Sequence, residues 1–155
     1  MDREPTERPS VALHGREDRP LRRTILRSAV AVAEPLRTFL DRYADAYAAL
    51  DAHALVEMYA MPCLFIGSGQ TASFDSPEAL LRHLGYVAER RREESIGAAV
   101  PTRVQTLADG GGQTVVLVHW IIERTGDSPL RFRSLYHLVH ADGLWRIAVS
   151  SSLDD

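Results

Sequence analysis

The chain has 155 residues, of which 45% are hydrophobic and 25% are charged, and this size and composition are those of one globular domain. The formal net charge of −3 argues against non-specific binding of nucleic acid, which requires a positive surface field. Cys63 is the one cysteine in the sequence, so an intrachain disulfide and a multi-cysteine metal site are both excluded.

The first part of the chain predicts a cytoplasmic protein with an N-terminal tail. Met1 is followed by charged residues and prolines, where a secretory signal needs a basic start and then a continuous apolar stretch. No apolar run reaches the ~18–20 residues that cross a bilayer, so no transmembrane helix is expected. Lys and Asn are absent, a bias typical of a GC-rich bacterial genome.

Residues 1–33 mix prolines and arginines with few large apolar groups, which predicts a flexible tail before a folded domain at 34–155.

Two helices are predicted at the start of the folded domain. In the first, which begins near Glu34, large apolar residues recur at three- and four-residue steps, the period of an amphipathic helix. The second helix, Ala52–Ala60, has Asp51 as its N-cap and is expected to end before Pro62. The apolar stripe of the first helix consists of Leu36, Phe39, Leu40, Tyr43, Tyr47 and Leu50.

A small hairpin and a third helix follow. Two short apolar runs, Cys63–Ile66 and Thr71–Phe74, flank a Gly-Ser-Gly turn and predict paired strands. Ser76 then supplies an N-cap, followed by a proline at the first helical position. This third helix is predicted to run toward Arg92, with a polar and exposed end over Glu89–Glu94.

Four long strands are predicted in the rest of the chain. The turns between them are short and rich in Gly, Asp and Pro, so consecutive strands should pair antiparallel. The run Gly110–Gly112 lies between two of these strands, which predicts a hairpin turn rather than a phosphate-binding loop. The predicted strands are Arg103–Ala108, Thr114–Arg124, Leu130–Val139 and Leu144–Ser151.

This order of elements resembles the NTF2-like (SnoaL-like) superfamily from about Glu34 to Leu153. The resemblance rests on the Tyr43 and Tyr47 pattern and on the segments 50–60, 74–80 and 142–147. It implies an α+β cone, in which three N-terminal helices pack on a curved antiparallel sheet. Because the superfamily includes isomerases, cyclases, dehydratases, an epoxide hydrolase and transport factors, the resemblance implies no single reaction.

The expected register of the long strands defines an inner face of the sheet, because side chains alternate across a strand. We pair Arg124 with Leu130 and Val139 with Leu144. One face is then apolar almost throughout, including Val149, and we expect the helices to cover it and to leave an aromatic-lined pocket. The alternative is that the aromatic residues form core, each with one hydrogen-bond partner. The predicted ligand-binding residues are Tyr43, Tyr47, Tyr59, Trp120, Ser134 and Tyr136.

The opposite face of the sheet is predicted to form a homodimer contact. It is half apolar, which is more than a solvated sheet surface normally shows. Similar proteins commonly dimerise through this side, and a two-fold dimer needs such a self-complementary patch. The residues expected in this contact are Leu117, His119, Ile121, Leu135 and Val139.

Catalytic candidates come partly from the resemblance. The oxyanion-binding tyrosine of ketosteroid isomerase corresponds to Tyr43, but its catalytic carboxylate falls on Gly67, so that activity is not expected. The remaining candidates are Tyr43 or Tyr136 as a hydrogen-bond donor and Asp75 or His83 as a base. Asp75 equally suits a helix-start turn, and a histidine beside an apolar stripe is more often structural. The histidines are dispersed along the chain, so no metal site is expected. No cofactor is expected either.

Three functions are therefore consistent with the sequence. The first is a domain that binds a small, largely apolar molecule in the aromatic-lined pocket. The second is a biosynthetic enzyme, a cyclase, dehydratase or isomerase, that uses the tyrosine hydroxyls with an Asp or His base. The third is an interaction module that binds a protein through the sheet face or the Arg-rich tail. The first two differ in whether a titratable group lines the pocket.

Overall fold

The computed structural model describes residues 34–94 and 96–154, so the tail predicted at 1–33 lies outside the described residues. Within these ranges three helices and one six-stranded sheet are present. No helix in them is long and apolar enough to cross a membrane. The elements are α2 (Leu36–Ala48), α3 (Ala52–Glu57), β1 (Tyr59–Gly67), β2 (Gln70–Phe74), α4 (Pro77–Glu93), β3 (Ile96–Gly110), β4 (Gln113–Arg124), β5 (Leu130–Ala141) and β6 (Leu144–Ser152).

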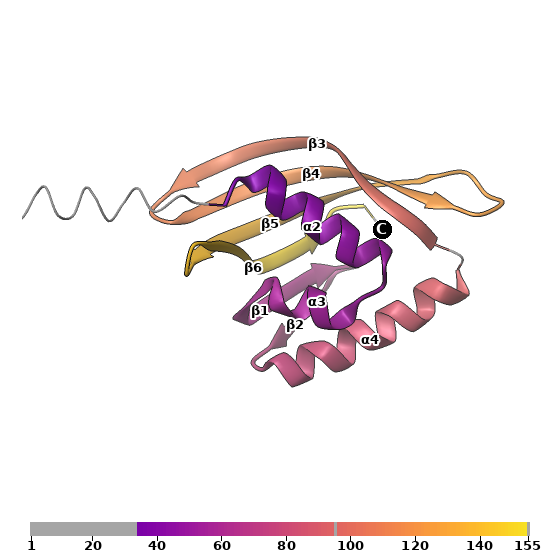
Figure 1. Ribbon diagram of the computed structural model, residues 1–155, viewed down its shortest axis with the longest axis horizontal. Coiled ribbons are helices and arrows are strands. Elements are labelled where there is room, and N and C mark those ends of the chain that lie inside the picture. Colours follow the sequence, from indigo (N-terminus) through magenta and orange to yellow (C-terminus); the bar gives the residue numbers. More distant parts are fainter. Residues whose placement is uncertain (1–33, 95, 155) are drawn as a thin grey trace, which may run out of the picture. The chain divides into compact units, whose positions relative to one another are not determined.

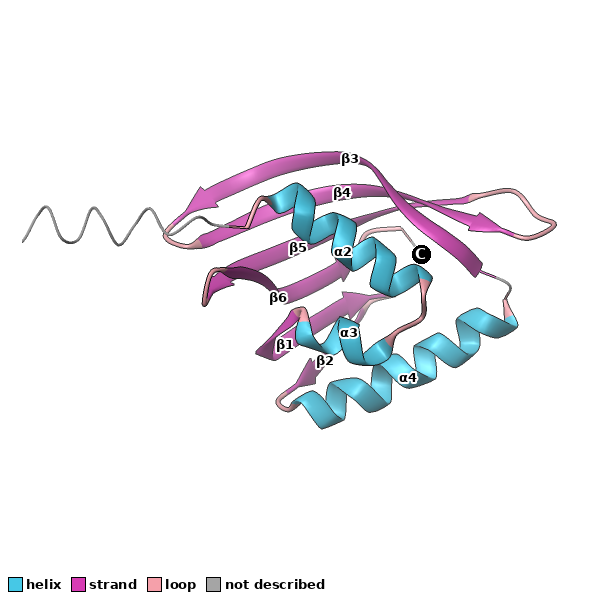
Figure 2. Ribbon diagram, viewed as in Figure 1, coloured by secondary structure: helices cyan, strands magenta, loops and turns pink. Residues whose placement is uncertain are grey.

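The sheet has the strand order β2-β1-β6-β5-β4-β3. Strands β3 to β6 form the predicted antiparallel meander, and β1 joins its β6 edge in a parallel pairing. Figure 1 shows the long strands curving over α2, with α3 and α4 nearer to β1 and β2. In Figure 2 the helices gather on one side of the strands. The α+β cone expected from the sequence is confirmed.

The predicted helix starts are present with their capping bonds. The Asp51 carboxylate accepts a hydrogen bond from the Ala54 amide at 3.0 Å, and the Ser76 hydroxyl accepts one from the Ala79 amide at 3.2 Å. These side chains satisfy amide groups that have no partner within the helix. The start of α2 is held instead by Glu34, whose backbone carbonyl accepts a bond from the Trp145 indole N–H at 2.8 Å. This bond ties α2 to β6.

Three predicted boundaries are wrong by three residues or more. The second helix ends at Glu57 rather than Ala60, and Tyr59 already opens β1. The cause is tertiary. The Ile147 amide of β6 donates a hydrogen bond to the Met58 carbonyl at 2.9 Å, so the chain leaves the helix and pairs with the sheet from this point. Pro62 therefore lies inside a strand. Similarly, β3 starts at Ile96 rather than at Arg103. It pairs with β4 over residues that precede the predicted strand.

The β4–β5 register confirms the predicted inner face. The structure pairs Ile122, not Arg124, with Leu130, a shift of two residues. Because the side-chain period of a strand is two, this shift leaves every residue on its predicted face. The β3–β4 turn has Gly111 and Gly112 at positive φ, as a tight hairpin turn requires. The fully buried inner-face residues of β4 to β6 include Val116, Val118, Ile122, Leu138 and Ile147.

The second half of β6 has the opposite facing from the one predicted. Leu138 pairs with Ile147 and His137 with Val149, so Ala148 is an extra residue in a β-bulge. Val149 consequently lies on the outer face with His137. The bulge brings Ser150, the partner of Tyr136 in the sheet, to the inner face.

Candidate functional site

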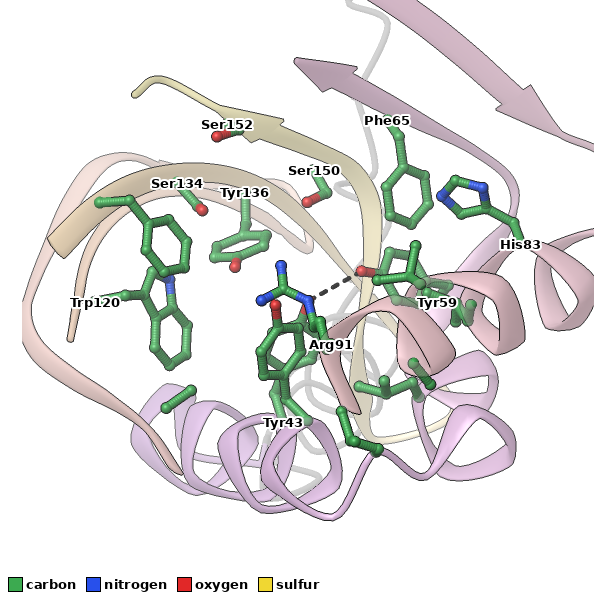
Figure 3. Close-up of a pocket in the computed structure, with 18 of the residues that line it drawn as sticks. Tyr43, Tyr59, Phe65, His83, Arg91, Trp120, Ser134, Tyr136, Ser150 and Ser152 are labelled. Atoms are coloured by element: carbon green, nitrogen blue, oxygen red, sulfur yellow. Dashed lines mark hydrogen bonds between the residues drawn. The ribbon is translucent and has the colours of Figure 1, made fainter. Parts of the chain in front are cut away.

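A cavity of about 230 Å³ lies between the helices and the inner face of the sheet. Its wall contains side chains from all three helices and from every strand except β2, and Figure 3 shows them around one space. The structure brings together all six residues that the sequence analysis assigned to a pocket; contact with a ligand stays a prediction. These residues are Tyr43, Tyr47, Tyr59, Trp120, Ser134 and Tyr136.

Tyr43 is the centre of the aromatic wall. Its hydroxyl lies 3.1 Å from the Tyr59 hydroxyl in a buried hydrogen bond. Its ring centroid is 5.7 Å from that of Tyr136 and 6.0 Å from that of Trp120. One helical turn later Tyr47 stacks on it at 6.3 Å. The three- and four-residue spacing of α2 thus places two phenols on the face that meets β4 and β5.

The buried phenols are hydrogen-bond donors at neutral pH. Burial raises the pKa of Tyr43 and of Tyr136 well above the usual range for tyrosine, and the neighbouring phenol raises each further. The pKa of Tyr59 is raised by burial and next by Tyr136. These groups stay protonated, because ionising any of them would place a negative charge in an apolar surrounding. Their O–H groups can bind a carbonyl or an oxyanion.

Of the two predicted bases, one lies in the wall. His83 of α4 lines the cavity and packs on Phe65 and Phe74, with ring centroids 5.5 Å and 4.9 Å away. Burial lowers its pKa, so the imidazole is neutral at pH 7. Asp75 is exposed before α4 and is not among the residues of the wall. Among the lining residues that the structure describes, none is Asp or Glu.

Two kinds of polar lining residue were not predicted from the sequence. Ser150 and Ser152 enter the wall through the bulge in β6, which no sequence signal indicates. Arg91 was placed in the exposed end of the third helix, yet it is half-buried and lines the cavity. The spacing from Leu84 and Ala88 indicates the side of the helix on which Arg91 lies, but it does not indicate that this polar end of the helix faces a cavity.

Neither Cys63 nor a histidine cluster forms a second site in the described part of the chain. Cys63 is buried in the core, where burial raises the pKa of its thiol and lowers its reactivity. His137 is bonded to Gln113, its ring nitrogen lying 2.7 Å from the side-chain oxygen. Residues 34–94 and 96–154 hold no group of three or more His, Cys, Asp or Glu side chains arranged to bind a metal.

The helices, the curved sheet and the cavity between them define an NTF2-like protein of the α+β cone class. A family model described as "NTF2-like protein (DUF6841)" matches residues 33–155. The chain belongs to this family.

Solved structures of the same fold share little sequence with this chain. A protein of unknown function from Mycobacterium tuberculosis has 16% identity and a TM-score of 0.62, over 77% of this chain and 74% of its own. An NTF2-like protein with a cystatin-like fold from Novosphingobium aromaticivorans has 16% identity and a TM-score of 0.61, over 86% of each chain. An NTF2-like protein from Cytophaga hutchinsonii has 20% identity and a TM-score of 0.56, over 86% and 97%. At these identities the likeness shows the fold. The search of curated proteins returned no match.

Proposed function

We propose that this NTF2-like domain binds a small, largely apolar molecule in the cavity beside Tyr43. The observation that supports this function is a cavity of about 230 Å³ walled by aromatic rings and lined by hydroxyl groups. An apolar cavity of about 150 Å³ already takes a benzene molecule, so this one has room for one or two fused rings. The Tyr136 and Ser134 hydroxyls in the wall would orient a polar group on such a molecule.

A catalytic use of the same cavity is the second candidate. Protonated phenols and the neutral His83 imidazole line one space, which is the donor and base pair that a cyclase, dehydratase or isomerase reaction needs. We rank it second because His83 packs on two phenylalanine rings, at the end of the wall formed by β1 and α4.

The binding function is tested with 2-naphthamide, a neutral two-ring probe. We expect isothermal titration calorimetry to show saturable one-site binding to the wild-type chain. Replacing the lining residue Ala88 of α4, Ala88→Phe, would fill the cavity and abolish binding, because the new ring occupies the space of the probe. The control is Ala108→Phe, at an exposed position of β3, which should bind as the wild type does.

Two outcomes would contradict the binding function. One is the lack of saturable binding to the wild-type chain by both 2-naphthamide and its carboxylate analogue, 2-naphthoate. The other is equal binding by Ala88→Phe when circular dichroism shows that this variant is folded, since the probe would then occupy another place.

We also propose that the domain is a homodimer through the outer face of the sheet. This proposal is supported by the apolar character of a face on which Leu117, Ile121 and Leu135 are half-buried within one chain. Light scattering at micromolar concentration should give twice the chain mass of 17.2 kDa. Replacing Leu117 by glutamate should shift the mass to that of one chain, and a wild-type monomer would refute the dimer.

A cytoplasmic location in a bacterium stays a proposal. It is supported by the single, unpaired and buried cysteine, which suits a reducing compartment.

A further inference from the structure

The cavity wall carries one cationic side chain that has no ion-pair partner among the described residues. Arg91, in the last turn of α4, is the one Arg or Lys among the lining residues that the structure describes. Figure 3 shows it extending toward the middle of the lining residues. Its Nε atom is buried and has no hydrogen-bond partner among the described residues.

Two of the three acidic residues near the end of α4, Glu89 and Glu94, form ion pairs with the neighbours of Arg91. Glu94 pairs with Arg90 at 3.5 Å, and Glu89 pairs with Arg92 at 3.6 Å. Both pairs are exposed. Successive residues of a helix point about 100° apart, so Arg91 faces the cavity while Arg90 and Arg92 face solvent. In residues 34–94 and 96–154 Arg91 has no ion pair within 4.0 Å.

The contact that Arg91 does make leaves its hydrogen-bond donors free. Its guanidinium carbon lies 4.6 Å from the centroid of the Tyr47 ring. A guanidinium stacked on a ring uses its flat face, whereas its N–H groups lie in its plane and remain available at the edge. Two parallel N–H groups at that edge match the two oxygens of a carboxylate.

Trp120 gives independent evidence for a missing acceptor. Its side chain is 2% exposed and lines the cavity, yet the indole Nε1 has no hydrogen-bond partner among the described residues. Buried N–H groups without partners are rare in folded proteins and carry a cost of desolvation. Two unpartnered donors in one wall, one of them cationic, indicate a ligand that brings hydrogen-bond acceptors and negative charge.

We propose that the ligand is a small aromatic carboxylate, bound with its carboxylate on Arg91 and its rings among the aromatic side chains of the wall. This inference rests on the proposed binding function and names the class of ligand. Arg91 is the one lining cation and no carboxylate lines the cavity among the described residues, so the site can neutralise one negative charge. A dianionic phosphate would leave a net charge in an apolar surrounding. The volume of about 230 Å³ limits the ring system to one or two rings.

The test compares 2-naphthoate with its neutral isostere 2-naphthamide by calorimetry on the full chain at about pH 7.5, where the carboxylate is ionised. We expect the wild type to bind naphthoate about tenfold or more tightly than naphthamide, because charge-assisted bidentate bonds form with the anion alone. Arg91→Met should remove this preference and leave the naphthamide affinity within about twofold, because its unbranched side chain keeps the packing.

The flanking arginine supplies a matched control. Arg90→Met removes the same charge from the preceding residue, which is exposed, and should keep the preference for naphthoate. Arg91→Lys keeps the charge without the planar donor pair and should retain part of the preference. This second variant tests the site even if Arg91→Met does not fold.

Titrating both probes distinguishes a failure of the carboxylate proposal from a failure of the proposed binding function. Equal affinity of the wild type for both probes, or an unchanged preference in a folded Arg91 variant, would overturn the carboxylate ligand while the binding function stands. Failure of both probes to bind the wild type would overturn the binding function and the inference with it. If Arg90→Met loses the preference for naphthoate as fully as Arg91→Met does, the effect comes from the total positive charge at the end of α4. That result would overturn the direct pairing of the carboxylate with Arg91.

Discussion

Phe39→Ala should lower the free energy of unfolding by about 3–5 kcal/mol, the usual cost of removing a buried phenylalanine side chain. Phe39 is 1% exposed and is the first residue of the buried stripe of α2, and its ring centroid lies 6.4 Å from that of Tyr43. The substitution leaves a cavity under the helix that carries two phenols of the site. Urea unfolding followed by circular dichroism measures the loss.

The control is Tyr86→Ala, an aromatic residue on α4 that is 64% exposed. Its effect should stay within about 0.5 kcal/mol, as is usual for surface substitutions. A loss below about 1 kcal/mol for Phe39→Ala would contradict the packing of α2 against the sheet, because removing a buried phenylalanine side chain typically costs about 3–5 kcal/mol.

Removing the Tyr43 hydroxyl is expected to have the second largest effect. Tyr43→Phe leaves the Tyr59 hydroxyl buried without its 3.1 Å partner, which costs about 1–3 kcal/mol of stability. The double variant Tyr43→Phe/Tyr59→Phe should lose less than the sum of the two single variants, because each single variant breaks the same Tyr43–Tyr59 bond. A double-mutant cycle of unfolding free energies measures this coupling.

This cycle also separates a core tyrosine from a ligand-binding one. If Tyr43 is core, Tyr43→Phe lowers stability and leaves the affinity for 2-naphthamide unchanged. Unchanged stability together with weaker binding would show that the hydroxyl serves the ligand instead, and would contradict the structural role that the 3.1 Å bond indicates. Tyr86→Phe, at an exposed position, is the control for both measurements.

Local chemistry explains why much of the fold was predictable. Asp51 and Ser76 are strong N-cap residues, and each one caps the helix expected of it. The inner face was predicted correctly although the register was wrong. Pairing Ile122 rather than Arg124 with Leu130 shifts the strand by two residues, and an even shift leaves each side chain on the same face. Five of the six predicted pocket residues line the cavity for this reason or because the α2 stripe has a clear helical period, whereas Tyr59 lines it from β1 and not from the predicted second helix.

The sequence by itself thus determined the order of the elements, the helix starts and the inner aromatic face, since these depend on neighbours within a few residues of one another. Tertiary structure alone decided the parallel entry of β1, the bulge at Ala148 and the direction of Arg91. In each case the deciding partner is distant in the chain. The Ile147 amide of β6 binds the Met58 carbonyl, and the pairing with β5 leaves Ala148 as an extra residue. The Arg91 guanidinium stacks on the Tyr47 ring of α2. The polar residues that most shape the ligand proposal, Arg91 and Ser150, belong to this second group, because a side chain faces a cavity only once the fold has closed around it.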